Sequence, residues 1–195
     1  MDIILASTSK IRRNILSNAG IEFSVVDSEL DETATKNSML KLPPRNLALE
    51  LAKLKSRKVS IQNPKATVIG ADQVLGFKEQ IFNKPASRAD AEKQLSMLKN
   101  ATHTLYSAIS CTVAGEELWN HCSEAQLTMR DFTAEFLSSY LNGSPESYLS
   151  SVGAYKLEEA GIQLFEKIEG DYFTILGLPI LPLLKFLRNR EIIQS

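Results

Sequence analysis

The chain has 195 residues, a formal net charge of −1, 44% hydrophobic and 23% charged residues. This length can bury a full core, and the near-neutral charge gives no overall field that would favour nucleic acid or an acidic membrane. We find neither a signal-peptide pattern nor an apolar run near the roughly 18 residues that span a bilayer. The two cysteines, Cys111 and Cys122, form no C-x-x-C pattern, so we expect buried thiols in a reducing cytoplasm. The sequence therefore predicts one cytoplasmic domain, residues 1–195, with neither nucleic acid nor membrane as a partner.

Apolar periodicity predicts an alternation of strands and helices along the chain. The runs expected to form strands are residues 2–6, 22–32, 66–77, 102–113, 116–129, 161–170 and 171–177. The runs expected to form helices are residues 7–20, 43–60, 87–100, 133–142 and 182–190. This order favours an α/β (α+β) fold, with a mixed sheet and helices on both sides.

Local signals mark several boundaries of these elements. Ser7, Thr8 or Ser9 can cap the first helix, and a Ser-x-x-Asp capping box begins at Ser87. The two long strands are expected to form an antiparallel hairpin that turns at residues 114–116.

The opening stretch "LASTSKIRRNIL" is the first candidate site. A strand that leads into a helix N-terminus leaves unpaired backbone N–H groups where the helix dipole is positive, and phosphate is favoured there. Ser7 and Ser9 add hydroxyls, and Arg12 and Arg13 add guanidinium groups that match phosphate oxygens. Taken alone, the stretch is more typical of an ordinary helix cap with exposed arginines. It is neither a P-loop nor a G-x-G-x-x-G motif.

Carboxylates supply two further candidates. Asp72 is expected at the polar end of an apolar strand, where it could bind a divalent cation or accept a proton from water. Asp31 and Glu32 follow the second predicted strand and suit a hard cation such as Mg²⁺. An Asx turn at Asp72 and an ordinary acidic turn at residues 31–32 are the structural alternatives.

Isolated basic residues complete the candidate set. Lys55 lies on a basic helix face, and Lys84 precedes a proline that fixes the local turn. Either lysine could neutralise phosphate charge, although a solvated helix face also explains Lys55. His103 and His121 have no metal-ligand spacing, and His103 is expected to be a hydrogen-bonded structural or cleft-edge residue.

The order of these motifs is more specific than any one of them. "LASTS", "RR", "DE", "LAKLKS", "GADQV", "NKP", "THTLYSA", "SVGAY" and "IEGDYFTILGLP" run from Leu5 to Pro179. In this order they resemble the Maf family of nucleoside triphosphate pyrophosphatases. The resemblance implies an elongated mixed sheet with two lobes around a cleft, akin to the inosine-triphosphatase-like fold. It also implies Mg²⁺- or Mn²⁺-dependent hydrolysis of a nucleoside triphosphate to the monophosphate and pyrophosphate, with a homodimer compatible with the family.

The resemblance also implies roles for particular residues. Asp72 is expected to be the proton acceptor, with Lys55 and Lys84 as catalytic lysines and with Glu32 and Asp72 at the metal. The first-motif serine and arginine of the family fall on Ser7 and Arg13, and we include Arg12 among the phosphate-binding residues. Such a set suits phosphoryl transfer, which chiefly needs positioning and electrostatic stabilisation.

Substrate preference is expected to depend on Ile11, Gln73 and Glu158. The family branch that acts on dTTP and UTP has arginine, threonine and glutamine at these positions. Gln73 and Glu158 instead resemble the branch that hydrolyses 7-methyl-GTP, although that branch has an aromatic residue at the position of Ile11. We expect Glu158 to be a buried acid that accepts from the edge of a modified guanine in a house-cleaning reaction. The alternatives are a dTTP/UTP pyrophosphatase and a regulatory nucleotide-binding protein in septum formation or cell-division arrest.

Overall fold

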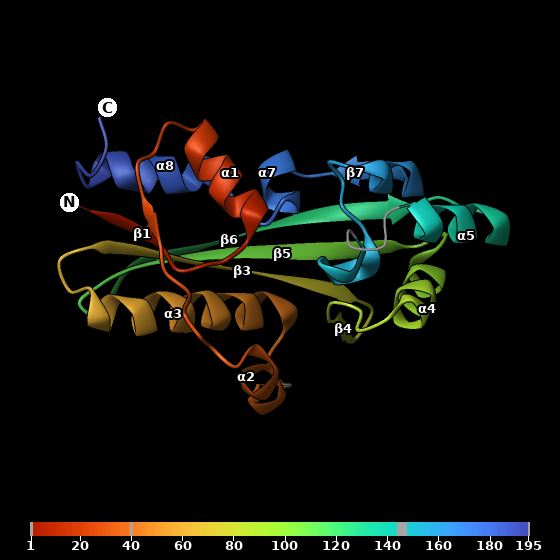
Figure 1. The fold of residues 1–195 in the computed structure, drawn as a ribbon, viewed down its shortest axis with the longest axis horizontal. Coiled ribbons are helices and arrows are strands. Elements are labelled where there is room, and N and C mark those ends of the chain that lie inside the picture. The colour runs from red at the N-terminus through yellow and green to blue at the C-terminus, as the bar shows by residue number, and fades with distance from the viewer. Residues whose placement is uncertain (1, 40, 144–147, 195) are drawn as a thin grey trace. The chain divides into compact units, whose positions relative to one another are not determined.

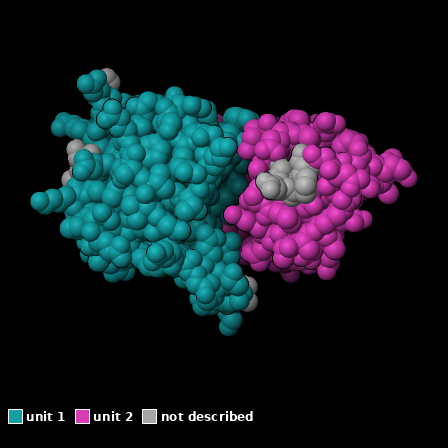
Figure 2. Space-filling model, viewed as in Figure 1, with its two compact units in different colours: residues 1–73, 107–123, 172–195 teal, residues 74–106, 124–171 magenta. Residues whose placement is uncertain are grey.

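The computed structural model describes residues 2–39, 41–143 and 148–194. The chain forms two compact units (Figure 2). Unit 1 comprises residues 1–73, 107–123 and 172–195, and unit 2 comprises residues 74–106 and 124–171. The two lobes expected from the family resemblance are thus present as compact units, whereas the elongated shape and the cleft between them stay predictions.

The described residues form a seven-stranded sheet in the order β2-β1-β3-β5-β6-β7, with β4 paired to β3 off this path. The strands are β1 (Ile3–Leu5), β2 (Ser24–Val25), β3 (Thr67–Phe77), β4 (Gln80–Phe82), β5 (Thr102–Val113), β6 (Glu116–Met129) and β7 (Phe165–Glu169). β1 pairs in parallel with β2 and β3, whereas the β3–β4 and β6–β7 pairs are antiparallel. The mixed sheet confirms the predicted α/β class.

Helices cover both faces of the sheet in unit 1, with α1 and α8 on one face and α3 on the other (Figure 1). The helices of this unit are α1 (Lys10–Asn18), α2 (Glu32–Ser38), α3 (Pro44–Gln62), α7 (Tyr172–Ile175) and α8 (Ile180–Asn189). Successive side chains of a strand point to opposite faces. Ile3 and Leu5 therefore join the buried cluster that includes α1 and α8, whereas Ile4 and Ala6 join Val59 of α3.

Unit 2 contains α4 (Arg88–Leu98), α5 (Ala134–Gly143) and the 3₁₀ turns η1 (Val152–Ala154) and η2 (Ala160–Leu164). Helix α4 begins as its capping box predicts, because the side chain of Ser87 accepts a hydrogen bond from the backbone N–H of Asp90 at 3.1 Å. Ala91, Leu95 and Leu98 form the buried face of this helix, as their spacing predicts.

Four local predictions are wrong. Residues 171–177 contain helix α7 instead of a strand. The second strand is only Ser24–Val25, and residues 161–164 belong to η2. Ser9 occupies the N-cap position of α1, but its side chain makes no capping hydrogen bond. Helix α7 is held by hydrogen bonds from Gln73 and Ser107, which are distant in sequence and which local composition does not encode.

The expectation that both cysteines are buried is confirmed. Cys111 and Cys122 are both free and buried, as expected for small apolar thiols. Over the residues that the structure describes, no helix is long and apolar enough to cross a membrane.

Candidate active site

The parallel strands of unit 1 bring the opening stretch beside Asp72. In the register of β1 and β3, Leu5 lies opposite Ile69, and the N–H of Ala6 donates to the carbonyl of Ile69 at 2.8 Å. β1 ends there, while β3 continues through Asp72. Ser7 therefore lies just after the carboxyl end of β1, beside the longer neighbouring strand β3. This edge is where open α/β sheets commonly bind ligands.

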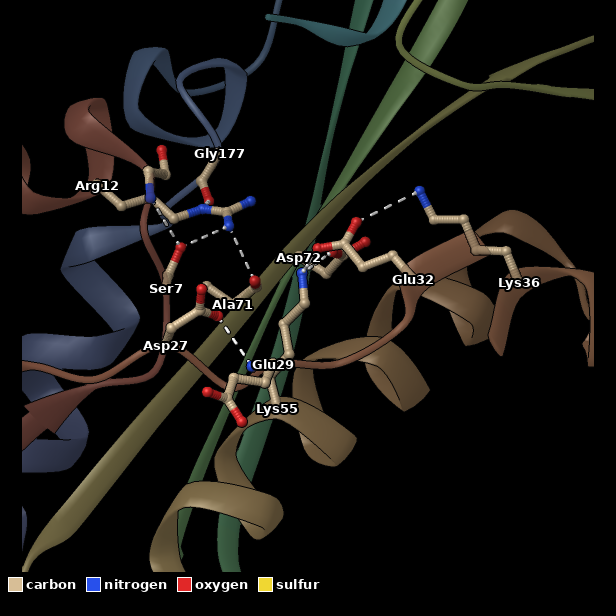
Figure 3. Close-up of polar contacts among 11 residues, drawn as sticks. Ser7, Arg12, Asp27, Glu29, Glu32, Lys36, Lys55, Ala71, Asp72 and Gly177 are labelled. Atoms are coloured by element: carbon tan, nitrogen blue, oxygen red, sulfur yellow. Dashed lines mark hydrogen bonds and ion pairs between the residues drawn. The ribbon is translucent and has the colours of Figure 1, made fainter. Parts of the chain in front are cut away.

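Three charged side chains meet at this edge (Figure 3). The ammonium nitrogen of Lys55 lies 2.6 Å from Oδ1 of Asp72 and 2.7 Å from Oε1 of Glu32. The Lys55 and Asp72 side chains are buried, and the Glu32 side chain is 46% exposed. Oδ2 of Asp72 is buried and has no hydrogen-bond partner in the described structure. The site thus holds one lysine between two carboxylates, with an oxygen of Asp72 left for a ligand.

A close approach between α3 and β3 places Lys55 at this position. A Cβ on Gly70 would collide with the carbonyl oxygen of Ala52 and lie 2.7 Å from the backbone nitrogen of Ser56. Glycine therefore allows the helix to pack directly on the strand. Lys55 lies on the buried face of α3, so the solvated-face interpretation of this lysine is wrong.

Arg12 forms the second part of the site. Its Nε donates to the carbonyl of Gly177 at 2.9 Å, and its Nη1 donates to the carbonyl of Ala71 at 2.9 Å and to Oγ of Ser7 at 3.2 Å (Figure 3). Burial lowers the pKa of Arg12, while the nearby charges of Asp72 and Glu32 raise it. Ser7 is itself buried, and its Oγ also accepts from the backbone N–H of Ser9 at 3.3 Å. A serine hydroxyl and an oriented guanidinium thus stand beside the carboxylate cluster.

Arg12 donates to Ser7, whereas Arg13 is exposed, and the expected role of Arg13 at a phosphate stays a prediction. The structure corrects two other expectations about this region. Asp72 lies inside an eleven-residue strand and not in a turn at its end. Asp31 caps α2, because its side chain accepts a hydrogen bond from the N–H of Ala34 at 2.9 Å. Glu32, the next residue, forms the ion pair with Lys55.

The remaining predicted site residues lie in different surroundings. Lys84 and Glu158 belong to unit 2 and both are exposed, which contradicts the expectation of a buried Glu158. Their place beside a bound nucleotide stays a prediction. Ile11 is partly buried and packs against the apolar cluster of α1 and α8.

Gln73 makes contacts that the sequence does not indicate. Its amide nitrogen lies 2.9 Å from Oγ of Ser107, 3.1 Å from the carbonyl of Thr174 and 2.9 Å from the carbonyl of Ile175. Sequence reasoning missed Ser107, which also donates to the carbonyl of Thr174 at 2.7 Å. The only available signal was its position in the "THTLYSA" block, which gives no partner.

His103 is structural, as expected. It lies buried in unit 2, and its Nε2 is 2.7 Å from the hydroxyl of Tyr155. Burial lowers the pKa of His103 to about 4, so the ring is neutral near pH 7.

The donor set at Asp72 and Glu32 fits a hard divalent cation. Oδ2 of Asp72 is a buried carboxylate oxygen without a partner, and such an oxygen is a preferred ligand of Mg²⁺. No cluster of three or more His, Cys, Asp and Glu side chains able to hold a metal occurs among residues 2–39, 41–143 and 148–194. Mg²⁺ is usually bound by one or two carboxylates, with water and substrate phosphates completing its shell. The two carboxylates therefore match the manner in which Mg²⁺ binds together with a phosphorylated ligand.

Fold and site together define an α/β protein with a carboxylate-lysine cluster and an oriented arginine at the carboxyl ends of parallel strands. The family model described as "Maf-like protein" matches residues 2–190, and the chain belongs to this family.

Relatives with assigned names are similar over nearly their whole length. A protein of Rhizobium johnstonii named 7-methyl-GTP pyrophosphatase is 48% identical over 189 residues, covering 96% of this chain and 95% of the relative. A protein of Hyphomonas neptunium named nucleoside triphosphate pyrophosphatase is 45% identical over 195 residues, covering 99% of this chain and 98% of the relative. Among solved structures, a HAM1 protein from Coxiella burnetii has a TM-score of 0.43 and 14% identity, covering 66% of this chain and 73% of that one.

Proposed function

We propose that this protein hydrolyses a nucleoside triphosphate to the monophosphate and pyrophosphate. The observation that carries the proposal is the cluster of Lys55, Asp72 and Glu32 beside Arg12 and Ser7. Membership of the Maf-like family and the names of the relatives support the same reaction.

Asp72 is the general base of the proposed reaction. Its Oδ1 is held by Lys55, and its partner-free Oδ2 is available to accept a proton from water. The oxygen of that water attacks the α-phosphorus, and the bond from the α-phosphorus to the bridging oxygen breaks. Pyrophosphate leaves with the electron pair of that bond, and the water proton passes to Asp72.

Positive charge and hydrogen-bond donors stabilise the phosphates. Arg12, the hydroxyl of Ser7 and the N-terminus of α1 lie together at the strand ends. Lys55 neutralises developing charge near Asp72, and Lys84 adds a second positive charge from unit 2 when the nucleotide is bound. A divalent cation at Asp72 and Glu32 would supply charge neutralisation and orientation of phosphate oxygens.

The substrate we propose is a modified purine nucleotide of the 7-methyl-GTP type, which the protein removes from the cytoplasmic nucleotide pool. The relatives named 7-methyl-GTP pyrophosphatase support it, as does the acidic side chain of Glu158, whose charge favours a methylated, positively charged base.

The test is a nucleotide panel with Mg²⁺ or Mn²⁺ and separate detection of pyrophosphate and inorganic phosphate. We expect one pyrophosphate per monophosphate and the highest kcat/KM for 7-methyl-GTP. If dTTP or UTP were the best substrate, the proposed preference for a modified purine would be wrong, while the proposed reaction would still hold. Release of inorganic phosphate with a nucleoside diphosphate would contradict the reaction itself. Comparing Glu158→Gln with Glu159→Gln, an adjacent exposed acid, tests whether the preference depends on this position.

A further inference from the structure

Helix α3 carries a buried hydroxyl next to Lys55. Ser56 is fully buried, and its Oγ lies 2.7 Å from Oγ1 of Thr112 and 3.1 Å from Oγ of Ser110, both on β5. The same Oγ lies 3.1 Å from the carbonyl oxygen of Lys53. Thr112 and Ser110 are also fully buried, and buried polar groups need such partners. The helix is therefore tied to β5 by side-chain hydrogen bonds, in addition to its close packing on β3.

The hydroxyl protons give these hydrogen bonds a direction. Oγ of Ser110 donates to Oε1 of Glu117 at 2.9 Å, and a hydroxyl has only one proton to donate. Ser110 therefore accepts from Ser56, and Ser56 in turn accepts from Thr112. The ammonium of Lys53 lies 3.4 Å from Oε2 of Glu117 and balances the charge at the end of this chain of bonds. Removal of one hydroxyl leaves a buried neighbour without its partner, which is costly.

Contacts with two strands fix the rotation of α3 about its axis. Where the helix crosses β3, a Cβ on Gly70 would collide with the backbone of Ala52 and Ser56, so this contact sets the distance between helix and strand. A contact with one strand still lets a helix roll over it, and the bonds from Ser56 to β5 oppose that roll. Successive residues of a helix are about 100° apart around its axis. A roll that moves Ser56 therefore also moves Lys55, whose ammonium lies 2.6 Å from Oδ1 of Asp72.

We propose that Ser56 and Thr112 are positioning residues that hold the ammonium of Lys55 on Asp72. The hydroxyl of Ser56 bonds to β5 and to the helix backbone, so it acts on Lys55 through the position of α3. The effect on turnover rests on the proposed function, which assigns chemistry to Lys55 and Asp72. The effect on the ion pair itself does not depend on any substrate.

The first test is a double-mutant cycle on stability, which needs no nucleotide. The midpoint of urea unfolding is measured for Ser56→Ala in the native background and in an Asp72→Asn background. Part of the loss caused by Ser56→Ala is a weakened Lys55–Asp72 ion pair, and this part is absent once the charge of Asp72 has been removed. We therefore expect Ser56→Ala to lower the midpoint about twice as much in the native background as in the Asp72→Asn background.

The matched control is Ser60→Ala, about one turn further along the same helix. Ser60 is also fully buried, and its Oγ accepts from the backbone N–H of Gly115 at 3.0 Å. This bond ties α3 to the turn between β5 and β6, further along the helix from Lys55. Ser60→Ala should therefore lower the midpoint equally in the two backgrounds.

A second variant removes the same contact from the strand side. Thr112→Val keeps the shape of the side chain and deletes the hydroxyl that bonds to Ser56. It should follow the pattern of Ser56→Ala, and it decides the question if Ser56→Ala does not fold. Equal losses in the native and Asp72→Asn backgrounds would overturn the proposal, because a purely structural contact adds independently of Asp72.

The second test measures turnover with the best nucleotide of the panel. We expect Ser56→Ala to lower kcat about tenfold and to change KM less than about twofold, because a misplaced Lys55 acts on the chemical step. Ser60→Ala should keep both constants within about twofold of the native values. An unchanged kcat for Ser56→Ala, or a higher KM alone, would contradict the positioning role. If no nucleotide is hydrolysed, the proposed function fails, and the unfolding cycle still decides whether Ser56 positions Lys55.

Discussion

The two units bury polar side chains in opposite ways. In unit 1, Lys55 and Asp72 are buried as an ion pair, with Glu32 completing the cluster and one oxygen of Asp72 left without a partner. In unit 2, His103 and Tyr155 are buried as a neutral hydrogen-bonded pair packed against the ring of Phe165, and Nδ1 of His103 likewise has no hydrogen-bond partner in the described structure. A buried ion pair is weak evidence for stability, because the cost of desolvating the two charges offsets their attraction. A buried neutral pair can stabilise a core. The comparison therefore supports the chemistry proposed for the first cluster and a packing role for the second.

The largest expected effect comes from removing the cation of the first cluster. Lys55→Met leaves Asp72 buried without its partner, and breaking a buried pair typically costs about 3–5 kcal/mol of unfolding free energy. Urea unfolding near pH 7 measures the change. The matched control is Lys99→Met in unit 2, whose partner Asp131 lies at 2.8 Å with a side chain that is 74% exposed. An exposed pair contributes about 0–1 kcal/mol. If both variants lost a similar unfolding free energy, the Lys55–Asp72 pair would not behave as a buried ion pair.

The second prediction concerns the pH dependence of unit 2. The pKa of His103 is about 4 in the folded protein and about 6.5 in an unfolded chain. The stability that the neutral ring contributes is fully present above about pH 6.5 and is lost as the pH falls towards 4, because the unfolded state then binds the proton more strongly. Between these values, about 3 kcal/mol should be lost. His103→Gln has no titrating ring, so urea unfolding should show a shallower acid loss for this variant by about that amount. If the unfolding free energies of the variant and the native protein fell equally with decreasing pH, a neutral buried His103 would be contradicted.

The third prediction sharpens the packing role of unit 2. Gly153 has a φ of +78°, and a Cβ there would lie 2.6 Å from Cδ1 of Leu75 and 2.7 Å from Cε1 of Tyr155. Gly20 has a similar φ of +73°, with nothing within 4 Å. Both alanine variants carry backbone strain of order 1 kcal/mol, and Gly153→Ala adds overpacking of about 1–3 kcal/mol. The melting temperature of Gly153→Ala should therefore be well below that of Gly20→Ala. Equal melting temperatures would mean that the backbone around Gly153 relaxes to accommodate the methyl group, which would contradict tight packing there.

The smallest expected effect separates two helix caps. Ser87 caps α4 through its side chain, whereas Ser9 precedes α1 without a capping bond. Ser87→Ala should lower the unfolding free energy by about 1 kcal/mol, and Ser9→Ala by a smaller amount. Chemical denaturation of both variants measures the difference, and a larger loss for Ser9→Ala would contradict the cap assignment.

Local features of the fold were predictable from the sequence because their causes are local. The capping box at Ser87 satisfies a backbone group three residues away, and the β5–β6 turn falls on Ala114 and Gly115, both with positive φ. The extent of β3 matches the predicted run of residues 66–77. Its pairing with β4 through Leu75 and Phe82 is not encoded by the composition of β3. Residues 172–175 form a helix whose carbonyls accept from Gln73 and Ser107. Such tertiary contacts override local strand propensity.

The candidate site was predictable in its residues and only partly in its geometry. Asp72, Lys55, Glu32 and Ser7 were identified from order and resemblance, and the structure brings the first three together with Ser7 at the same strand ends. The burial of Lys55 could not be read from a basic helix face, because its partner Asp72 lies on another element. Of two adjacent arginines, only the fold decides that Arg12 turns inward to Ala71 and Gly177.

The most direct test of the central claim is the rate of pyrophosphate release by Asp72→Asn with the best nucleotide of the panel and Mg²⁺ or Mn²⁺. Loss of a general base typically lowers kcat by about 10²–10⁴-fold, so we expect a fall of at least about 100-fold in a protein that still unfolds cooperatively. Asp131→Asn, at an exposed carboxylate of unit 2, should keep the native rate. Asp72→Asn protein that retains most of the native rate would contradict the account.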